Sequence, residues 1–168
     1  MAAKIMQRFP QDSVLRRKAK RVPTVDKSIR RLIDDMLVTM QKEGGVGLAA
    51  PQIGVPLRVA VIQMPEEEPI ALINPEIVKR VGEREVTEAC LSVPGYAGEI
   101  KRSVSVTVKG WDQSGKTIRI KATGLMAQAL EHELDHLNGV LFIDHIDSSD
   151  KLHRVEAETE AKAKSEGM

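Results

Sequence analysis

The segment His132-Glu133-Leu134-Asp135-His136 constrains the fold more than any other part of the sequence. Four residues advance an α-helix by about 400°, so both imidazoles project from one helix face, one above the other. Glu133 lies about 100° round from His132 and can reach a water on a metal held by that pair. Buried histidines without partners would be costly. The motif therefore predicts a well-packed helix that presents two metal ligands and a carboxylate to one site.

Two histidines do not complete a catalytic site of the zinc type, which takes three protein ligands and leaves one position for water. The candidates are Cys90, His145, His153 and the acidic residues near the C-terminus. A metzincin pattern would place its last histidine where Phe142 stands, and Phe142 cannot ligate a metal. A thermolysin-like pattern is met by Glu156, which lies in an acidic run typical of a solvated face. Spacing alone leaves Cys90 and Glu156 open.

The order of hydrophobic patterns predicts one α+β catalytic domain over residues 1–168. An N-terminal helix is indicated by apolar residues at helical spacing from Ile29 to Met40, with Asp26 as its cap and Gly44-Gly45 as its end. A central helix, from about Leu125 to Leu137, carries the histidines. Small antiparallel or mixed sheets are expected to pack around this helix, with strands at 57–64, 70–73, 77–81, 140–143 and a hairpin at 104–109 and 118–120.

The C-terminal segment 147–168 is rich in Ala, Glu and Lys. Ser148 or Ser149 can cap a helix there, and Leu152 and Val155 are the apolar residues that can anchor it. The sequence therefore predicts a polar C-terminal helix with a frayed end.

The composition argues against several classes of protein. The chain has 25 basic and 24 acidic residues, and a net charge of +1 does not draw it to nucleic acid or to a membrane surface. Four aromatic residues are too few for a base-stacking surface. No apolar run approaches the roughly 18–20 residues of a membrane span, and no secretory signal is visible. A single cysteine favours a reducing compartment, so we expect a cytoplasmic protein without membrane or sequence-specific nucleic-acid partners. The basic run 16–21 is interpreted as a solvated surface.

The segment from Gly45 to Gly54 contains three glycines and imitates a dinucleotide-binding fingerprint. A helix precedes it where a strand is required, and Pro51 would break the helix that should follow. We therefore expect a closely packed loop in which small residues let the backbone approach a ligand, with the carboxamide of Gln52 beside it.

Three ordered segments resemble the peptide deformylase family, which is marked by GxGxAAxQ, EGCLS and QHExDHL. In this chain they read GVGLAAPQ (45–52), EACLS (88–92) and EHELDHL (131–137), and the similarity extends over about residues 10–146. The chain departs from the pattern in two places. Ala89 replaces a glycine at a position where a φ that only glycine adopts freely would be strained, whereas Glu131 replaces a glutamine and adds a negative charge beside His132. Either change can weaken metal binding or activity.

The resemblance implies a hydrolase that removes the formyl group from N-formylmethionine on newly made polypeptides and releases formate. It implies Cys90, His132 and His136 as ligands of one divalent metal, physiologically Fe(II), with Zn, Ni or Co as alternatives. Further roles follow for residues at matching positions: Glu133 as general base and then general acid, Gln52 and the Leu91 N–H as donors to the carbonyl oxygen, and Gly45, Val46 and Gly47 along the substrate groove. Transient ribosome association fits such a substrate, and Asp135 is a candidate for orienting a metal ligand.

The sequence leaves two rival hypotheses open. A metallopeptidase would use Glu156 as its third ligand and cut internal peptide bonds. A non-enzymatic metal-binding protein would result if Ala89 and Glu131 had spoiled the site.

Overall fold

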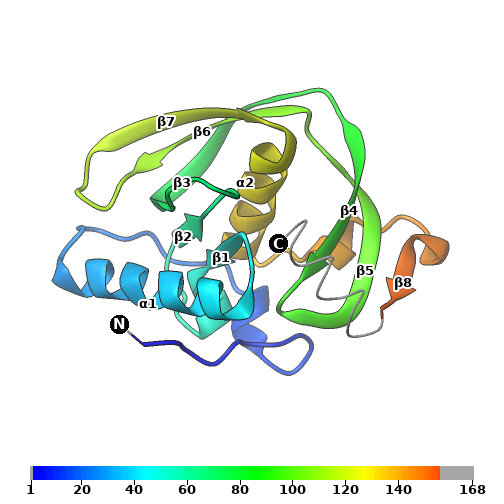
Figure 1. Ribbon diagram of the computed structural model, residues 1–168, viewed down its shortest axis with the longest axis horizontal. Helices are drawn as coiled ribbons and strands as arrows, with labels where there is room; N and C mark the ends of the chain where they lie inside the picture. The colour runs from blue at the N-terminus through cyan, green and yellow to red at the C-terminus, as the bar shows by residue number, and fades with distance from the viewer. Residues whose placement is uncertain (1, 156–168) are drawn as a thin grey trace.

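The computed structural model describes residues 2–155, in which two helices and two antiparallel sheets form an α+β fold (Figure 1). The N-terminal half contains α1 (Lys27–Glu43), β1 (Gly47–Ala49), β2 (Val59–Ile62), β3 (Ile70–Val81) and β4 (Arg84–Cys90). The C-terminal half contains β5 (Val93–Arg102), β6 (Ser105–Trp111), β7 (Thr117–Thr123), α2 (Gly124–Leu137) and β8 (Leu152–Arg154).

The strands form a five-stranded sheet in the order β1-β2-β3-β6-β7 and a three-stranded sheet in the order β4-β5-β8. Every pair of neighbouring strands is antiparallel. Figure 1 shows α2 between the larger sheet and the long β4–β5 ribbon. This placement brings the end of β4 close to the helix that carries both histidines of the motif.

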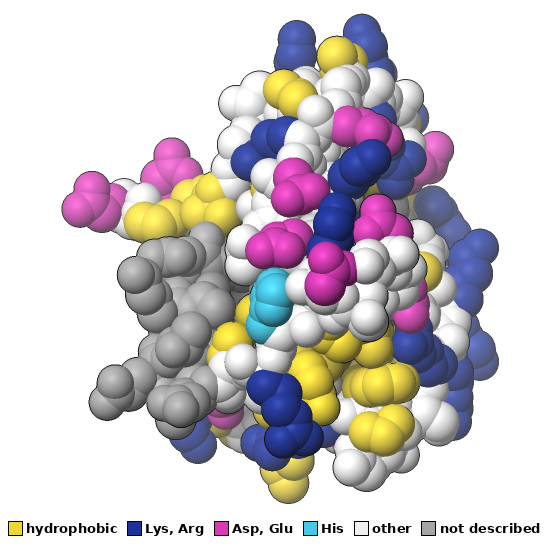
Figure 2. Space-filling view, turned by 90° about the vertical axis from the view of Figure 1, so that its right-hand side faces the viewer, with side chains coloured by type: hydrophobic (Ala, Val, Ile, Leu, Met, Phe, Trp, Pro, Cys, Tyr) yellow, Lys and Arg dark blue, Asp and Glu magenta, His cyan; other side chains and the backbone are white. Residues whose placement is uncertain are grey.

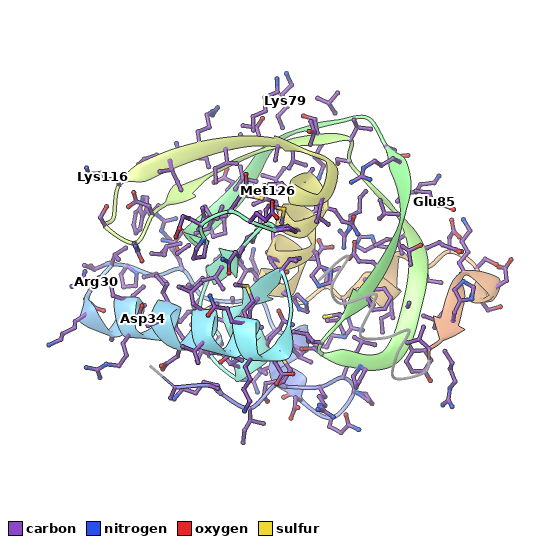
Figure 3. All side chains as sticks on the ribbon, viewed as in Figure 1. Arg30, Asp34, Lys79, Glu85, Lys116 and Met126 are labelled. Carbon is purple, nitrogen blue, oxygen red and sulfur yellow. The ribbon has the colours of Figure 1, made fainter. Side chains whose placement is uncertain are left out.

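The helix α1 forms as the sequence predicts. The Asp26 carboxylate accepts a hydrogen bond from the Ile29 N–H, and Gly44 ends the helix in the left-handed conformation with φ of 71°. The side chains of Ile29, Ile33 and Met36 are buried on one face. Residues of α1 on the opposite side, such as Arg30 and Asp34, are exposed, as are Lys79, Glu85 and Lys116 on the strands and the β6–β7 turn (Figure 3). The apolar stripe of this helix therefore explains its docking on the sheet.

Two expectations for the first half of the chain need correction. The two strands expected at 70–73 and 77–81 form one long strand, β3, which bends at Asn74-Pro75 and carries register shifts at 73–76 and 77–79. Asn74 adopts φ of 53°, and its side chain bonds both the N–H and the C=O of Val22, at 2.8 Å each. This bridge to a neighbouring segment holds the bend, so the strand continues beyond it. The strand expected at 57–64 is also shorter and spans β2, Val59–Ile62.

The predicted hairpin is confirmed as β6 and β7, with Val108 opposite Ile120. The strand expected at 140–143 is wrong, since Phe142–His145 forms a 3-10 turn. The Leu141 N–H donates to the Asp144 carboxylate, which stabilises this turn, and Phe142 is buried.

The predicted C-terminal helix is contradicted over its described part. Ser149–Lys151 forms a 3-10 turn and Leu152–Arg154 forms β8, which pairs with β5. Leu152 packs against an apolar cluster that includes Phe142. A free strand edge and one apolar contact thus prevail over a local helical preference that few apolar residues support. Residues 156–168, including Glu156, lie outside the described residues.

On the side of the molecule where β4 and β5 lie, the surface carries both positive and negative side chains. Acidic and basic side chains alternate over its upper part, and apolar side chains gather below them (Figure 2). Within residues 2–155, no helix combines the length and the apolar character that crossing a membrane requires.

Candidate metal centre

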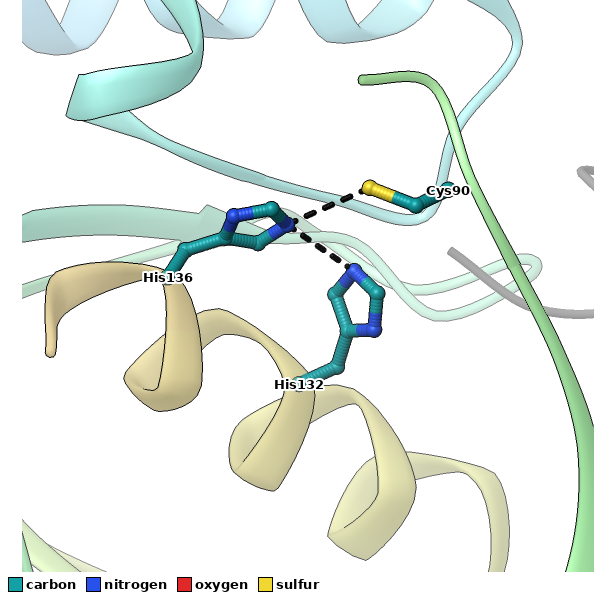
Figure 4. Close-up of side chains that lie close together, drawn as sticks. All are labelled: Cys90, His132 and His136. Atoms are coloured by element: carbon teal, nitrogen blue, oxygen red, sulfur yellow. Dashed lines mark hydrogen bonds between the residues drawn. The ribbon is translucent and has the colours of Figure 1, made fainter. Parts of the chain in front are cut away.

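Three potential metal ligands converge from two elements (Figure 4). The helix α2 contributes His132 and His136, one turn apart, and the end of β4 contributes Cys90. The His136 Nε2 lies 3.2 Å from the Cys90 Sγ and 3.1 Å from the His132 Nε2, and the three ligand atoms all lie within 4.8 Å of one another. All three side chains are buried. The structure therefore joins the cysteine segment to the helical motif, which spacing alone did not do.

The donor set fits a divalent transition metal. One sulfur and two imidazole nitrogens are ligands that Zn²⁺ and related ions accept, and three protein ligands leave a position open for water. The carboxylate of Glu133 is fully buried, and neither of its oxygens has a hydrogen-bond partner in the part of the chain that the structure describes. A buried carboxylate without partners is costly, and a water on a metal held by the three ligands would supply one.

A buried carboxylate orients one of the ligands. The Glu88 Oε1 lies 2.5 Å from the His132 Nδ1, which directs the Nε2 of the same ring toward Cys90 and His136. Sequence reasoning proposed Asp135 for this task. Asp135 instead contacts Arg102 at 2.7 Å and His145 at 2.8 Å, so it reaches the ligand only through other side chains.

The electrostatics of the centre follow from burial and from these partners. Burial raises the pKa of Glu133 to about 7. Burial alone would also raise the pKa of Glu88, but His132 and Arg102 lower it well below its usual range, so Glu88 is a carboxylate. Burial lowers the pKa of His136 well below its ordinary value, which favours the neutral ring that can ligate a metal.

The glycine-rich segment packs directly against the centre. A Cβ atom at Gly47 would lie 2.4 Å from the Glu133 Oε2, and one at Gly45 would lie 3.2 Å from the Leu91 Cδ1. Val46, between the two glycines, is buried. The two glycines therefore let the backbone approach both the carboxylate and the residue after Cys90.

Gln52 also faces the centre. Its Oε1 accepts a hydrogen bond from the Ala49 N–H at 2.9 Å, which fixes the carboxamide. Its Nε2 donates to the Ser92 Oγ at 3.2 Å and lies 3.7 Å from the Cys90 Sγ. The donor end of this side chain is thus held beside a ligand atom.

Comparison with known proteins decides the family. The sequence profile described as "Polypeptide deformylase" matches residues 4–152. A peptide deformylase of Dehalococcoides mccartyi is 57% identical over 145 residues, which cover 86% of this chain and 87% of that protein. A peptide deformylase of Halothermothrix orenii is 51% identical over 136 residues, or 80% of this chain and 88% of that protein.

The chain belongs to the polypeptide deformylase family. Membership makes it a hydrolase. Solved structures agree with the assignment. The crystal structure of a peptide deformylase from Legionella pneumophila has a TM-score of 0.83 and 43% identity, covering 98% of this chain and 93% of that one. A peptide deformylase from Ehrlichia chaffeensis in complex with actinonin has a TM-score of 0.85 and 38% identity, with coverage of 89% and 92%.

The two departures from the deformylase sequence pattern lie in unstrained surroundings. Ala89 pairs with Ala97 of β5, and it is not among the described residues with positive φ, so no glycine is needed there. The Glu131 carboxylate accepts hydrogen bonds from the N–H and the hydroxyl of Ser103, at 2.6 and 3.0 Å, and from Arg80 at 3.2 Å. Its charge is therefore engaged by other groups than His132.

Three polar residues that contact this centre or its partners were not predicted from the sequence, namely Glu88, Ser92 and Arg102. Glu88 and Ser92 lie in the same short segment as Cys90. Their closeness to Cys90 in the sequence is the signal that could have identified them. Two of the earlier ligand candidates lie elsewhere: His145 contacts Asp135, and His153 lies 3.5 Å from Glu99.

Proposed function

We propose that this chain hydrolyses the N-formyl group of peptides that begin with formylmethionine and releases formate. The observation that carries the proposal is the meeting of Cys90 from β4 with His132 and His136 from α2, beside the unpartnered carboxylate of Glu133. Membership in the deformylase family points to the same reaction. Because a formyl carbon carries only hydrogen, a tight site can exclude acetyl and longer acyl groups.

Cys90, His132 and His136 would hold one divalent metal. We propose Fe(II) as the physiological ion, with Zn, Ni or Co as substitutes, since sulfur and imidazole ligands accept all of these. A metal at this position would lower the pKa of a water held beside Glu133 and would polarise a carbonyl group.

Glu133 would move the proton. Its carboxylate accepts a proton from the attacking water as the new carbon–oxygen bond forms at the formyl carbon. It then gives that proton to the departing amine nitrogen as the carbon–nitrogen bond breaks, and formate and a free amino terminus result. The burial of Glu133 excludes bulk water from this exchange.

Gln52 and the backbone N–H of Leu91 would donate hydrogen bonds to the formyl oxygen. The negative charge that develops on this oxygen makes each such donor worth about 3–4 kcal/mol in the transition state. The bond from the Ala49 N–H to Gln52 supports this role, because it orients the carboxamide before substrate arrives. Gly45, Val46 and Gly47 would line the groove that receives the peptide.

We further propose one catalytic domain over residues 1–168 that acts in the cytoplasm on nascent peptides and associates transiently with ribosomes. The basic run at 16–21 is a candidate docking surface, and unchanged ribosome binding after its neutralisation would exclude it.

Formate release from a formyl-Met peptide by metal-loaded protein tests the proposal. The Glu133→Gln variant should retain metal and lose activity, whereas full activity in this variant would refute its role. The Cys90→Ser variant should lose metal. Retained metal together with cleavage of internal peptide bonds would favour a metallopeptidase instead.

A further inference from the structure

A network of polar and charged side chains connects the surface to one ligand of the centre. His145 is partly exposed and contacts Asp135 at 2.8 Å, and Asp135 contacts the buried Arg102 at 2.7 Å. Arg102 clamps Glu88, and Glu88 contacts His132 at 2.5 Å. This network lies next to the proposed metal site, but the proposed reaction gives no role to Arg102, Asp135 or His145.

Arg102 lies in the middle of this network and donates hydrogen bonds from three of its nitrogens. Its Nε donates to the Glu88 Oε2 at 3.0 Å and its Nη2 to the Glu88 Oε1 at 2.6 Å, which makes a two-point contact. Its Nη1 donates to the Asp135 Oδ2. A two-point contact fixes the rotation of a carboxylate as well as its position, which a lysine ammonium cannot do.

The orientation of Glu88 decides the orientation of His132. The Oε1 that faces the Nδ1 of the ring also accepts the Nη2 of Arg102, while the Oε2 accepts a further bond from Gln128 at 3.2 Å. Among the described residues, Glu88 is the hydrogen-bond partner recorded for the His132 Nδ1. By contrast, the Nδ1 of His136 is buried and has no hydrogen-bond partner among the described residues. The two histidines are therefore held differently, and only His132 is tied to the network.

Stability is a weak explanation for this arrangement. The desolvation of buried ions offsets much of their attraction, so an apolar set of similar volume often stabilises a fold as well. An outer contact that aims a metal ligand has a direct use, because removing such contacts lowers metal affinity by about 10- to 100-fold.

We propose that Arg102 is a positioning residue for the metal: through Glu88 it holds the His132 ring in the orientation that binds the ion, and Asp135 and His145 anchor it from the surface side. The proposal rests on the proposed function only in that a metal must bind at Cys90, His132 and His136.

The test is a titration of the metal-free full-length protein with Co²⁺ alone, followed by the visible absorption of the ion and its bond to the thiolate. The Arg102→Met variant should bind Co²⁺ about 10- to 100-fold more weakly, with shifted absorption bands. The Arg102→Lys variant keeps the charge but loses the two-point contact. Its Co²⁺ affinity should therefore lie between that of Arg102→Met and that of the wild type. Glu88→Gln should weaken binding, and adding Arg102→Met to it should have little further effect, because both act through one path.

Arg58→Met is the matched control. Arg58 donates to the Leu137 C=O and to Asn138 at the C-terminal end of α2, so its loss should lower stability and leave Co²⁺ affinity and bands unchanged. Wild-type affinity and bands in a folded Arg102→Met variant would overturn the proposal, as would losses that multiply in the double variant. If Arg102→Met does not fold, Arg102→Lys decides: a shifted spectrum with weaker binding supports the proposal, and a wild-type result overturns it. Failure of the wild type itself to bind Co²⁺ would refute the metal site, which is a separate outcome.

Discussion

Replacing Gly47 with alanine places a methyl group against the carboxylate of Glu133. The added Cβ would lie 2.4 Å from the Oε2 and 2.9 Å from the Cδ of that side chain, whereas ordinary contact begins at 3.4 Å. The carboxylate must therefore retreat by about 1 Å, and a misplacement of that size can cost about 10²-fold in rate. Gly47 does not have a positive φ, so alanine adds no backbone strain at this position.

We expect the kcat of Gly47→Ala for formate release from a formyl-Met peptide to fall about 10²-fold, equivalent to about 2.7 kcal/mol. Metal content should stay at the wild-type level, because the ligands are not displaced. Gly44→Ala is the control: Gly44 has φ of 71° with open space around it, so alanine there should lower stability and leave kcat unchanged. A kcat for Gly47→Ala within about threefold of wild type would refute the reasoning that the position of Glu133 limits the reaction.

Three further changes have defined outcomes. Gln52→Ala should lower kcat about 10²- to 10³-fold with metal retained; an unchanged kcat would remove its assigned role. Phe142→Ala should cost about 3–5 kcal/mol in urea denaturation, because the ring is buried, and a loss below about 1 kcal/mol would contradict its place in the core. Asp26→Ala should lower the urea midpoint at neutral pH. Hydrogen bonds from Ser28 and Ile29 lower the pKa of Asp26, so this stabilisation is present above its unfolded pKa and is lost on acidification. The difference between wild type and variant should therefore shrink below about pH 4, and a difference that persists there would exclude the carboxylate as its source.

Local signals predicted the helices well where they were strong. The helix α1 has a long apolar stripe, a capping aspartate and a terminal glycine, and all three act as expected. The helix α2 was placed to within one residue at its start, and Asn138 follows its last residue. The prediction of a C-terminal helix was wrong because residues 152–154 pair with the free edge of β5. This pairing depends on a strand that is distant in the sequence, so the local sequence does not reveal it.

The candidate site divides in the same way. The spacing of His132 and His136 follows from helix geometry, so the sequence alone predicts that they share a face. The choice of Cys90 as their companion depends on how β4 is placed against α2, and only the resemblance to the deformylase family favoured it in advance. Glu88 lies opposite Gly98 and Arg102 lies opposite Arg84, so the two residues are not cross-strand partners. Their contact depends on the tertiary arrangement of β4 and β5, which local sequence patterns do not contain.

X-ray absorption spectroscopy of the zinc-loaded protein tests the central claim most directly. We predict one zinc per chain with one sulfur neighbour at about 2.3 Å and two imidazole nitrogens at about 2.0–2.1 Å, and loss of the sulfur neighbour in Cys90→Ser. A zinc surrounded only by nitrogen and oxygen in the wild-type protein would contradict the account.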